Sequence, residues 1–169
     1  MTTFYACPYN LNVTGFYFES HEQYLSLSEG YADSFGNPVE EFEIQFIDGD
    51  TEDAQLVDAL RIAQSDLEAW FDSIEELRTG EKAALFFLVA NLGQSLADAL
   101  ETIDDVQRFD GALIDAATDQ FDDQNTTLPQ GVRMYIDCEA YARDCELNGD
   151  FAEIEFSGAT YTVLNANDL

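Results

Sequence analysis

The stretch EFEIQFID, residues 41–48, alternates polar and apolar side chains over its whole length. Successive side chains of an extended strand point to opposite faces of a sheet. The alternation therefore predicts a strand with one acidic face toward water and one apolar face toward a core. Helical and β-prone segments lie around this strand, so the first third of the chain is expected to be mixed α/β.

Toward the N-terminus, two further β-prone runs and one helix are expected. Residues 4–7 form a short run that Pro8 ends, and residues 14–18 form a second run rich in aromatic side chains. Ser20 has the character of a helix N-cap, and the Gly-Asn-Pro sequence at residues 36–38 is a stop signal. These signals predict a helix over residues 21–35.

Toward the C-terminus, apolar residues recur at helical spacing and the chain ends in a hairpin pattern. The predicted helices cover residues 67–77, 82–92, 95–103, 113–123 and 135–147, and the predicted hairpin strands cover residues 151–156 and 160–164. The fold class is therefore α+β, with an α/β N-terminal part, a helical middle and an α/β C-terminal part. The expected domains are an acidic α+β domain (1–62), a helical domain (63–107) and an α+β domain (108–169).

The chain is strongly acidic but not disordered in composition. Its 169 residues include 35 Asp and Glu against 6 Lys and Arg, which gives a formal net charge of −29. Hydrophobic residues make up 46% and aromatic residues 13%, enough to bury a core. The charge excludes binding of nucleic acid by phosphate neutralisation and binding to an anionic membrane surface. The longest fully apolar run, residues 83–90, is far shorter than the roughly 18 residues that span a bilayer.

Residues that carry catalytic or metal chemistry are sparse. His21 is the one histidine, and nothing in the sequence places a nucleophile beside it. Cys7, Cys138 and Cys145 show no CxxC spacing, which is typical of free thiols in a reducing cytoplasm. The acidic stretch 48–53 fails as a calcium loop because Asp53 stands where a glycine is required. We expect no catalytic residue, no metal, no cofactor and no signal peptide, and hence a cytoplasmic protein that is not an enzyme.

Two predicted helices each carry a row of carboxylates with the spacing i, i+4, i+7 and i+8. The rows consist of Glu68, Asp72, Glu75 and Glu76, and of Asp115, Asp119, Asp122 and Asp123. Like charges four residues apart destabilise a helix by a few tenths of a kcal/mol, and solubility alone needs a net charge of only about 2–8. A further requirement for the negative field is therefore expected.

Two requirements would explain such a field. One is a high-salt habitat, where screening removes the repulsion. The other is a partner that binds a polyanion such as DNA, which carries about one charge per 1.7 Å of duplex axis. At that density, 29 charges correspond to roughly 50 Å, or about 15 base pairs.

A family resemblance lies near the C-terminus. Residues 135–151 follow the pattern Y-I-D-x-x-A-Y-x-R-D-x-x-L-x-G-x-F and resemble the ArdA antirestriction family. The acidic helix 113–123, which leads into Leu128-Pro129, is similar to the antirestriction segment of that family. Residues 4–6 with Tyr9-Asn10 and Gly15 resemble its N-terminal strand pair, and residues 41–44 resemble the next strand.

The resemblance implies a function without catalysis. Members of the family are DNA mimics, elongated dimers of small domains in a line, which occupy the DNA-binding groove of type I restriction–modification enzymes and protect incoming mobile DNA. Carboxylates would then stand in for phosphates: the two rows above, together with the strand acids Glu41 and Glu43. Around the motif, Tyr135, Ile136, Tyr141 and Cys145 are expected in the core or in a dimer interface, and Arg143 is expected to pair internally, with Glu139 as a candidate.

Two alternative readings remain open from the sequence. The first is an acidic adaptor, halophilic or not, that binds a basic protein. The second is a DNA mimic directed at another basic DNA-binding protein, such as a repressor, a histone-like protein or a different nuclease. A halophilic protein would lose its fold at low salt, whereas a mimic that works in an ordinary cytoplasm would remain folded there.

Overall fold

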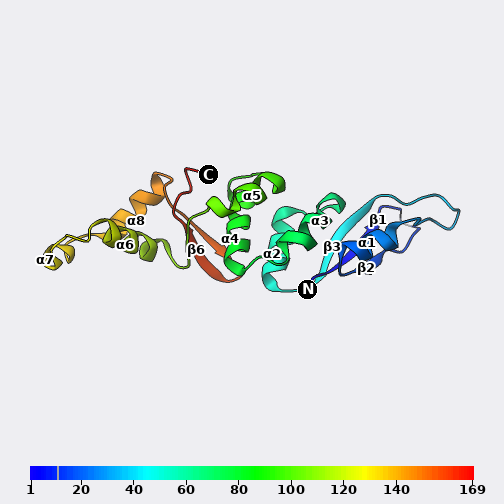
Figure 1. Ribbon diagram of the computed structural model, residues 1–169, viewed down its shortest axis with the longest axis horizontal. Coiled ribbons are helices and arrows are strands. Elements are labelled where there is room, and N and C mark those ends of the chain that lie inside the picture. The colour runs from blue at the N-terminus through cyan, green and yellow to red at the C-terminus, as the bar shows by residue number, and fades with distance from the viewer. Residues whose placement is uncertain (11) are drawn as a thin grey trace. The chain divides into compact units, whose positions relative to one another are not determined.

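The computed structural model describes residues 1–10 and 12–169. Helices account for 46% of the chain and strands for 18%, which agrees with the predicted α+β class. The chain divides into two compact units, Met1–Lys82 and Ala83–Leu169, and each is considered by itself (Figure 1). The three domains expected from the sequence remain a prediction.

A three-stranded antiparallel sheet organises the unit Met1–Lys82. Its strands are β1 (Thr3–Pro8), β2 (Phe16–Phe18) and β3 (Phe42–Asp48), in the order β2-β1-β3. Phe4 on the central strand pairs with Phe18 on one side and Phe46 on the other. The strand predicted from the alternating stretch is thus confirmed, and its exposed Glu43 lies between Phe42, which is buried, and Ile44, which is half-buried.

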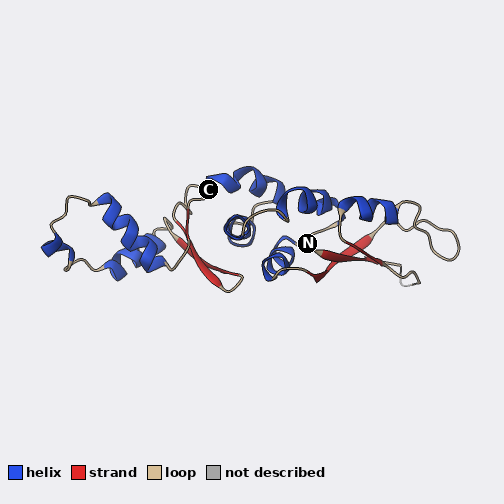
Figure 2. Cartoon of the chain, turned by 60° about the horizontal axis from the view of Figure 1, so that its bottom comes forward, coloured by secondary structure: helices blue, strands red, loops and turns tan. Residues whose placement is uncertain are grey.

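Helix α1 (His21–Ser28) lies along one face of this sheet, as Figure 2 shows. The Ser20 hydroxyl caps it by accepting a hydrogen bond from the Gln23 N–H at 3.1 Å. The predicted helix end at residue 35 is wrong, because the helix stops seven residues earlier, at Ser28. Gly30 follows with a left-handed φ of 71°, which a glycine adopts without the steric cost of a side chain.

A tight turn occupies the residues that were expected to continue helix α1. The Asp33 carboxylate accepts hydrogen bonds from the backbone N–H of Phe35 at 2.8 Å and of Asn37 at 2.9 Å, and from the Asn37 side chain at 3.0 Å. These bonds, above all the one from the Asn37 side chain, lower the pKa of Asp33. Local side-chain bonds of this kind compete with helical hydrogen bonds, and here they replace them.

The core of this unit is aromatic. The Phe4 ring contacts the rings of Phe18, Phe46, Trp70 and Phe71, with centroid distances of 5.6 to 6.2 Å. The last two residues come from the helical segment after β3, which the structure builds from α2 (Thr51–Leu60), the 3₁₀ turn η1 (Gln64–Asp66), α3 (Leu67–Ala69) and the π-helical turn η2 (Trp70–Ile74). Sequence reasoning did not predict α2.

A buried ion pair lies within the same unit. The Lys82 ammonium is 2.5 Å from the Asp53 carboxylate, and these side chains are only 6% and 1% exposed. The hydroxyl of Thr2, itself fully buried, lies 3.4 Å from the other carboxylate oxygen of Asp53. Asp53 belongs to the acidic stretch 48–53, which lacks the glycine of a calcium loop, and nothing in its local sequence indicates that it is buried.

The chain passes from the unit Met1–Lys82 into the unit Ala83–Leu169 within a helix. Helix α4 (Thr79–Phe86) carries the boundary between the units and continues into the π-helical turn η3 (Phe87–Asn91). These two elements match the predicted helix 82–92. The next elements, α5 (Leu96–Thr102) and the 3₁₀ turn η4 (Ile103–Asp105), match the predicted helix 95–103.

The remainder of this unit packs two helices against a second antiparallel sheet. The sheet consists of β4 (Arg108–Phe109), β5 (Ala152–Phe156) and β6 (Ala159–Val163) in the order β4-β6-β5, so the predicted terminal hairpin is confirmed. Helices α6 (Leu113–Gln124) and α8 (Cys138–Leu147) share a core of Ala116, Ala117, Ala142, Cys145 and Phe151. The short helix α7 (Gln130–Arg133) lies between them in the chain.

Helix α8 begins later than its sequence pattern indicated. The prediction started this helix at residue 135, but the Asp137 side chain accepts a hydrogen bond from the Ala140 N–H at 2.9 Å and caps the helix there. Tyr135 and Ile136 therefore precede the helix and belong to the turn that follows α7.

Candidate acidic interaction surface

The first carboxylate row lies on α3, η2 and the residues that follow them. Glu68, Asp72 and Glu76 are exposed, and none of the three pairs with a cation among the residues that the structure describes. Glu75 differs, because its side chain is only 20% exposed and lies 3.4 Å from the α-amino group of Met1. Its Oε1 also accepts a hydrogen bond from the Thr2 N–H at 2.5 Å, so Glu75 anchors β1.

The strand acids are at the edge of the first sheet. Glu43 is exposed on β3, where its carboxylate accepts a hydrogen bond from the Gln45 side chain at 3.2 Å. Glu41 is exposed immediately before the strand, and its carbonyl lies 3.4 Å from the Tyr9 N–H. Both carboxylates keep capacity to accept bonds from a partner, because an ionised carboxylate has about four lone-pair sites.

The second row lies on α6, an amphipathic helix. Asp115, Asp119 and Asp123 are exposed, while Ala116 and Ala117 of the same helix are buried in the core. Ala117 lies opposite the row, as helical periodicity predicts. Ala116 lies only three residues before Asp119, and its burial comes from packing against Ala142, Cys145 and Phe151.

The fourth member of this row has a partner of its own. Asp122 forms an ion pair with Arg133 at the end of α7, and both side chains remain about 40% exposed (42% and 39%). The hydrogen bond from Arg133 to Asp122 raises the pKa of that guanidinium. Asp122 therefore contributes less free negative charge than its three neighbours in the row.

The few cations neutralise little of the surface. Arg78 pairs with Glu81 at 2.5 Å and Arg108 with Asp110 at 2.8 Å. Lys82 forms the buried ion pair with Asp53 and neutralises no surface carboxylate. Arg143 forms no ion pair in the described part of the chain, so the expected bond to Glu139 is not formed. Most of the 35 carboxylates thus face solvent and form no ion pair among the residues that the structure describes.

The residues around the C-terminal motif divide between core and surface. Cys145 is buried in the core, and Tyr141 packs against that core, where its hydroxyl donates to the Gln120 side chain at 3.1 Å. Burial raises the pKa of Tyr141. Ile136 is half-buried, and Tyr135 is 83% exposed.

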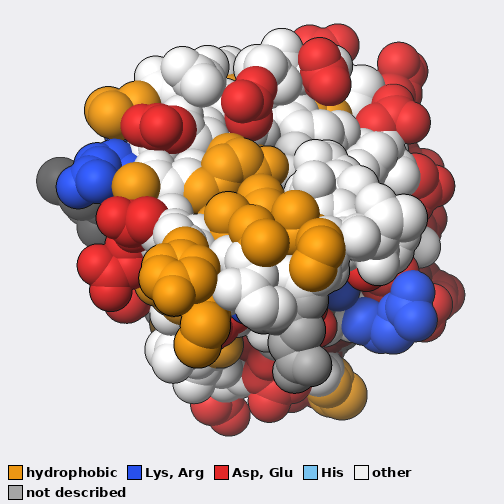
Figure 3. Space-filling model, turned by 90° about the vertical axis from the view of Figure 1, so that its left-hand side faces the viewer, with side chains coloured by type: hydrophobic (Ala, Val, Ile, Leu, Met, Phe, Trp, Pro, Cys, Tyr) orange, Lys and Arg blue, Asp and Glu red, His pale blue; other side chains and the backbone are white. Residues whose placement is uncertain are grey.

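Tyr135 belongs to an exposed apolar cluster at the end of this unit. Val132 and Met134 lie beside it in sequence and are 46% and 76% exposed. Figure 3 views that end of the chain and shows hydrophobic side chains gathered on the surface, with Asp and Glu side chains around them. Contiguous exposed apolar surface is a feature that protein interaction sites share.

The described residues hold no cluster of three or more His, Cys, Asp or Glu side chains that could bind a metal ion. Within the same residues, no helix is both long and apolar enough to cross a bilayer.

The chain is thus an acidic α+β protein whose described carboxylates are mostly exposed. The sequence model of the family described as antirestriction protein (ArdA) matches residues 13–158 of the 169, and the chain belongs to that family. Comparison with curated proteins and with solved structures finds no match.

Proposed function

We propose that this protein is a DNA mimic that occupies the DNA-binding groove of a type I restriction–modification enzyme and inhibits it without catalysis. Membership of the ArdA family supports antirestriction activity. The observation that carries the mimicry is the exposure of carboxylate rows on both units with few cations to neutralise them. The protein would act in the cytoplasm, where such enzymes meet incoming mobile DNA.

The proposed mechanism is electrostatic competition. A DNA-binding groove is lined by Lys and Arg, and carboxylates in place of phosphates would attract it over a long range and then compete with DNA. DNA binding itself weakens steeply as salt rises, because bound counterions are released, and the mimic should show the same dependence.

The first test is a competition assay. Purified protein is added to a type I restriction–modification complex bound to labelled duplex DNA, and the salt concentration is varied. We expect displacement of DNA near stoichiometric protein, with an inhibitory strength that falls as salt rises. Protein that stays folded at low salt yet displaces no DNA at any salt would contradict the proposal. The remaining alternatives would then be an acidic adaptor or a mimic of another DNA-binding protein.

We further propose that the protein is a homodimer formed through the exposed apolar cluster of Val132, Met134 and Tyr135. Burial of apolar surface contributes about 25 cal/mol per Å², and Val132, Met134 and Tyr135 are 46%, 76% and 83% exposed. Replacing Tyr135 by Ser and Met134 by Gln is expected to weaken self-association at least tenfold.

Sedimentation analysis over a range of protein concentrations measures this effect. The exposed Leu27 on α1 offers a matched control, because Leu27→Gln removes apolar surface outside the cluster and should leave the association unchanged. An association constant that is equal in the double variant and the parent would place the dimer interface elsewhere.

A further inference from the structure

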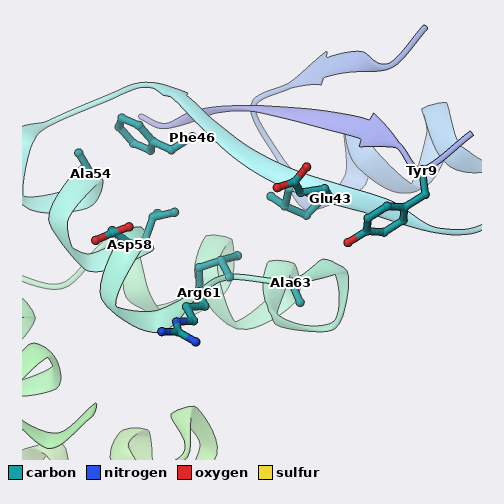
Figure 4. Close-up of a pocket in the computed structure, with 10 residues that line it drawn as sticks. Tyr9, Glu43, Phe46, Ala54, Asp58, Arg61 and Ala63 are labelled. Carbon is teal, nitrogen blue, oxygen red and sulfur yellow. The ribbon is translucent and has the colours of Figure 1, made fainter. Parts of the chain in front are cut away.

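Two of the six basic residues, Arg61 and Arg143, form no ion pair within the part of the chain that the structure describes. Arg61 is the C-cap of α2, and Figure 4 shows it with Asp58 on the helix side of a hollow beside β3. A cation at the C-terminus of a helix is stabilised by the helix dipole. No such explanation applies to Arg143, which lies inside α8.

Arg143 lies on the outward face of α8. Ala142 and Cys145 of this helix are buried in the core shared with α6, and Figure 1 shows the two helices side by side. Glu139, Arg143 and Leu147 are all exposed, Leu147 by 76%. Residues four apart share a face of a helix, with a rise of about 6 Å between them. The outward face therefore carries a stripe of one acid, one cation and one apolar side chain, named here the α8 stripe.

The α8 stripe is unsuited to a groove lined by Lys and Arg. An exposed Arg143 without an internal partner would repel such a groove, because like charges across an interface are unfavourable. The stripe instead fits a partner that presents an acid to Arg143 and a cation to Glu139. A second copy of α8 presents both.

The order of the residues around α8 is symmetric about residue 141. Glu139 and Arg143 lie two positions on either side of it, and Tyr135 and Leu147 lie six positions on either side. In a two-fold interface, when residue i contacts residue j of the other copy, j also contacts i. Two antiparallel copies of α8 that cross at residue 141 would thus place Glu139 opposite Arg143 twice. The same register would place Tyr135, which is 83% exposed in the turn before α8, opposite Leu147.

We propose that two copies of this chain pair through antiparallel α8 helices, with reciprocal Glu139–Arg143 ion pairs across the two-fold axis. The proposal rests on the proposed homodimer and deepens it, because it gives the register in which the two copies meet. Tyr135 of the apolar cluster packs against Leu147 of the other copy at each end of the contact. Arg143 then has a partner that its own chain does not provide.

Charge reversal at either position tests the contact. Glu139→Arg and Arg143→Glu should each raise the dissociation constant of the dimer at least tenfold, because each variant places two pairs of like charges across the axis. Glu139→Arg also makes the chain less negative, which by itself would favour association. A weaker dimer in that variant therefore reports the lost ion pairs. Sedimentation over a range of protein concentrations measures the dissociation constants.

An equal mixture of the two variants is the decisive sample. In a mixed dimer, the arginine introduced by Glu139→Arg faces the glutamate introduced by Arg143→Glu, and the native Arg143 faces the native Glu139. The dissociation constant of the mixture should return to within about threefold of the parent. Recovery of this kind also shows that each variant is folded, so the loss in the separate samples is not a folding defect.

Two control variants reverse charges away from the α8 stripe. Glu101→Arg changes an exposed acid on α5 of the same unit, and Arg78→Glu changes a side chain that is 86% exposed in the other unit. Both variants should leave the dissociation constant within twofold of the parent. Their mixture should behave like the separate samples.

The outcomes separate the register from the homodimer and from DNA mimicry. If the two reversals at α8 leave the dimer unchanged, or if both weaken it and the mixture does not recover, the antiparallel contact is wrong although the homodimer stands. If the parent is a monomer at every concentration, the homodimer and the contact both fail. Displacement of DNA by that monomer would still support the mimic. Recovery in the mixture alone supports the contact, whether or not DNA is displaced.

Discussion

Replacement of Lys82 by methionine is expected to lower the free energy of unfolding of the unit Met1–Lys82 by about 3 to 5 kcal/mol. Its ammonium is 2.5 Å from the Asp53 carboxylate, and both side chains are almost completely removed from solvent. Without Lys82, Asp53 would remain as a buried charge with no compensating cation. A change of this size is a large share of the roughly 5 to 15 kcal/mol that stabilises a domain.

Urea unfolding measures the effect directly, because the single tryptophan of the chain, Trp70, is fully buried in this unit and its fluorescence reports unfolding there. Arg78→Met is the matched control, since it also removes a cation from an ion pair but at a side chain that is 86% exposed. Little change is expected for it.

A second variant distinguishes the loss of a partner from the loss of the lysine side chain itself. Asp53→Leu combined with Lys82→Met replaces the whole pair by apolar residues and should recover most of the stability, because a buried ion pair contributes little net free energy over a packed apolar pair. A single Lys82→Met variant as stable as the parent would contradict the burial of an uncompensated charge. A double variant less stable than the single would show that the pair itself is strongly stabilising.

The second large effect is expected from the carboxylate rows. Neutralising the exposed, unpaired members of both rows should weaken displacement of DNA roughly 1,000-fold, although each single change should cost less than tenfold. The six substitutions are Glu68→Gln, Asp72→Asn, Glu76→Gln, Asp115→Asn, Asp119→Asn and Asp123→Asn. The slope of log affinity against log salt should also fall in magnitude, because six fewer charges contribute to the salt-dependent attraction.

A dispersed variant with the same loss of charge is the control. It carries Gln or Asn at six other exposed acids: Glu22, Glu29, Asp58, Glu101, Asp104 and Glu146. If the rows contact the groove, the dispersed variant should lose far less affinity, since it changes only the long-range attraction. Equal losses in the two variants would show that total charge alone determines the inhibition. A single substitution that abolishes inhibition in a folded protein would contradict the distributed model.

Local sequence was sufficient for most of the secondary structure. Alternation over residues 41–48 predicted β3, and the Ser20 cap signal predicted the start of α1, because both depend on interactions within a few residues. The end of α1 was missed, since the Asp33 turn competes with the helix through bonds that a helical pattern does not show. Helix α2 was missed because its start has a weak local signal: the N-cap residue Asp50 makes no side-chain cap hydrogen bond.

The exposure of the carboxylates on α6 was also predictable from the local sequence. Asp115, Asp119 and Asp123 are exposed on the side of α6 opposite Ala117, and the period of 3.6 residues that places them there is visible in the sequence. The apolar cluster was predicted less well. The sequence pattern does not separate Tyr135 from Cys145, but Cys145 lies in the helix core and Tyr135 in an exposed turn.

The sequence by itself determined the α+β class, the net charge of −29 and the ArdA resemblance, all of which depend on composition or on neighbours along the chain. Only the tertiary structure decided which charged groups are paired within the protein. Asp53 pairs with Lys82 across 29 positions, Asp122 with Arg133 across 11, and Glu75 binds the Thr2 N–H across 73. No periodicity in the chain encodes such distances, because these groups meet only after the strands and helices have packed.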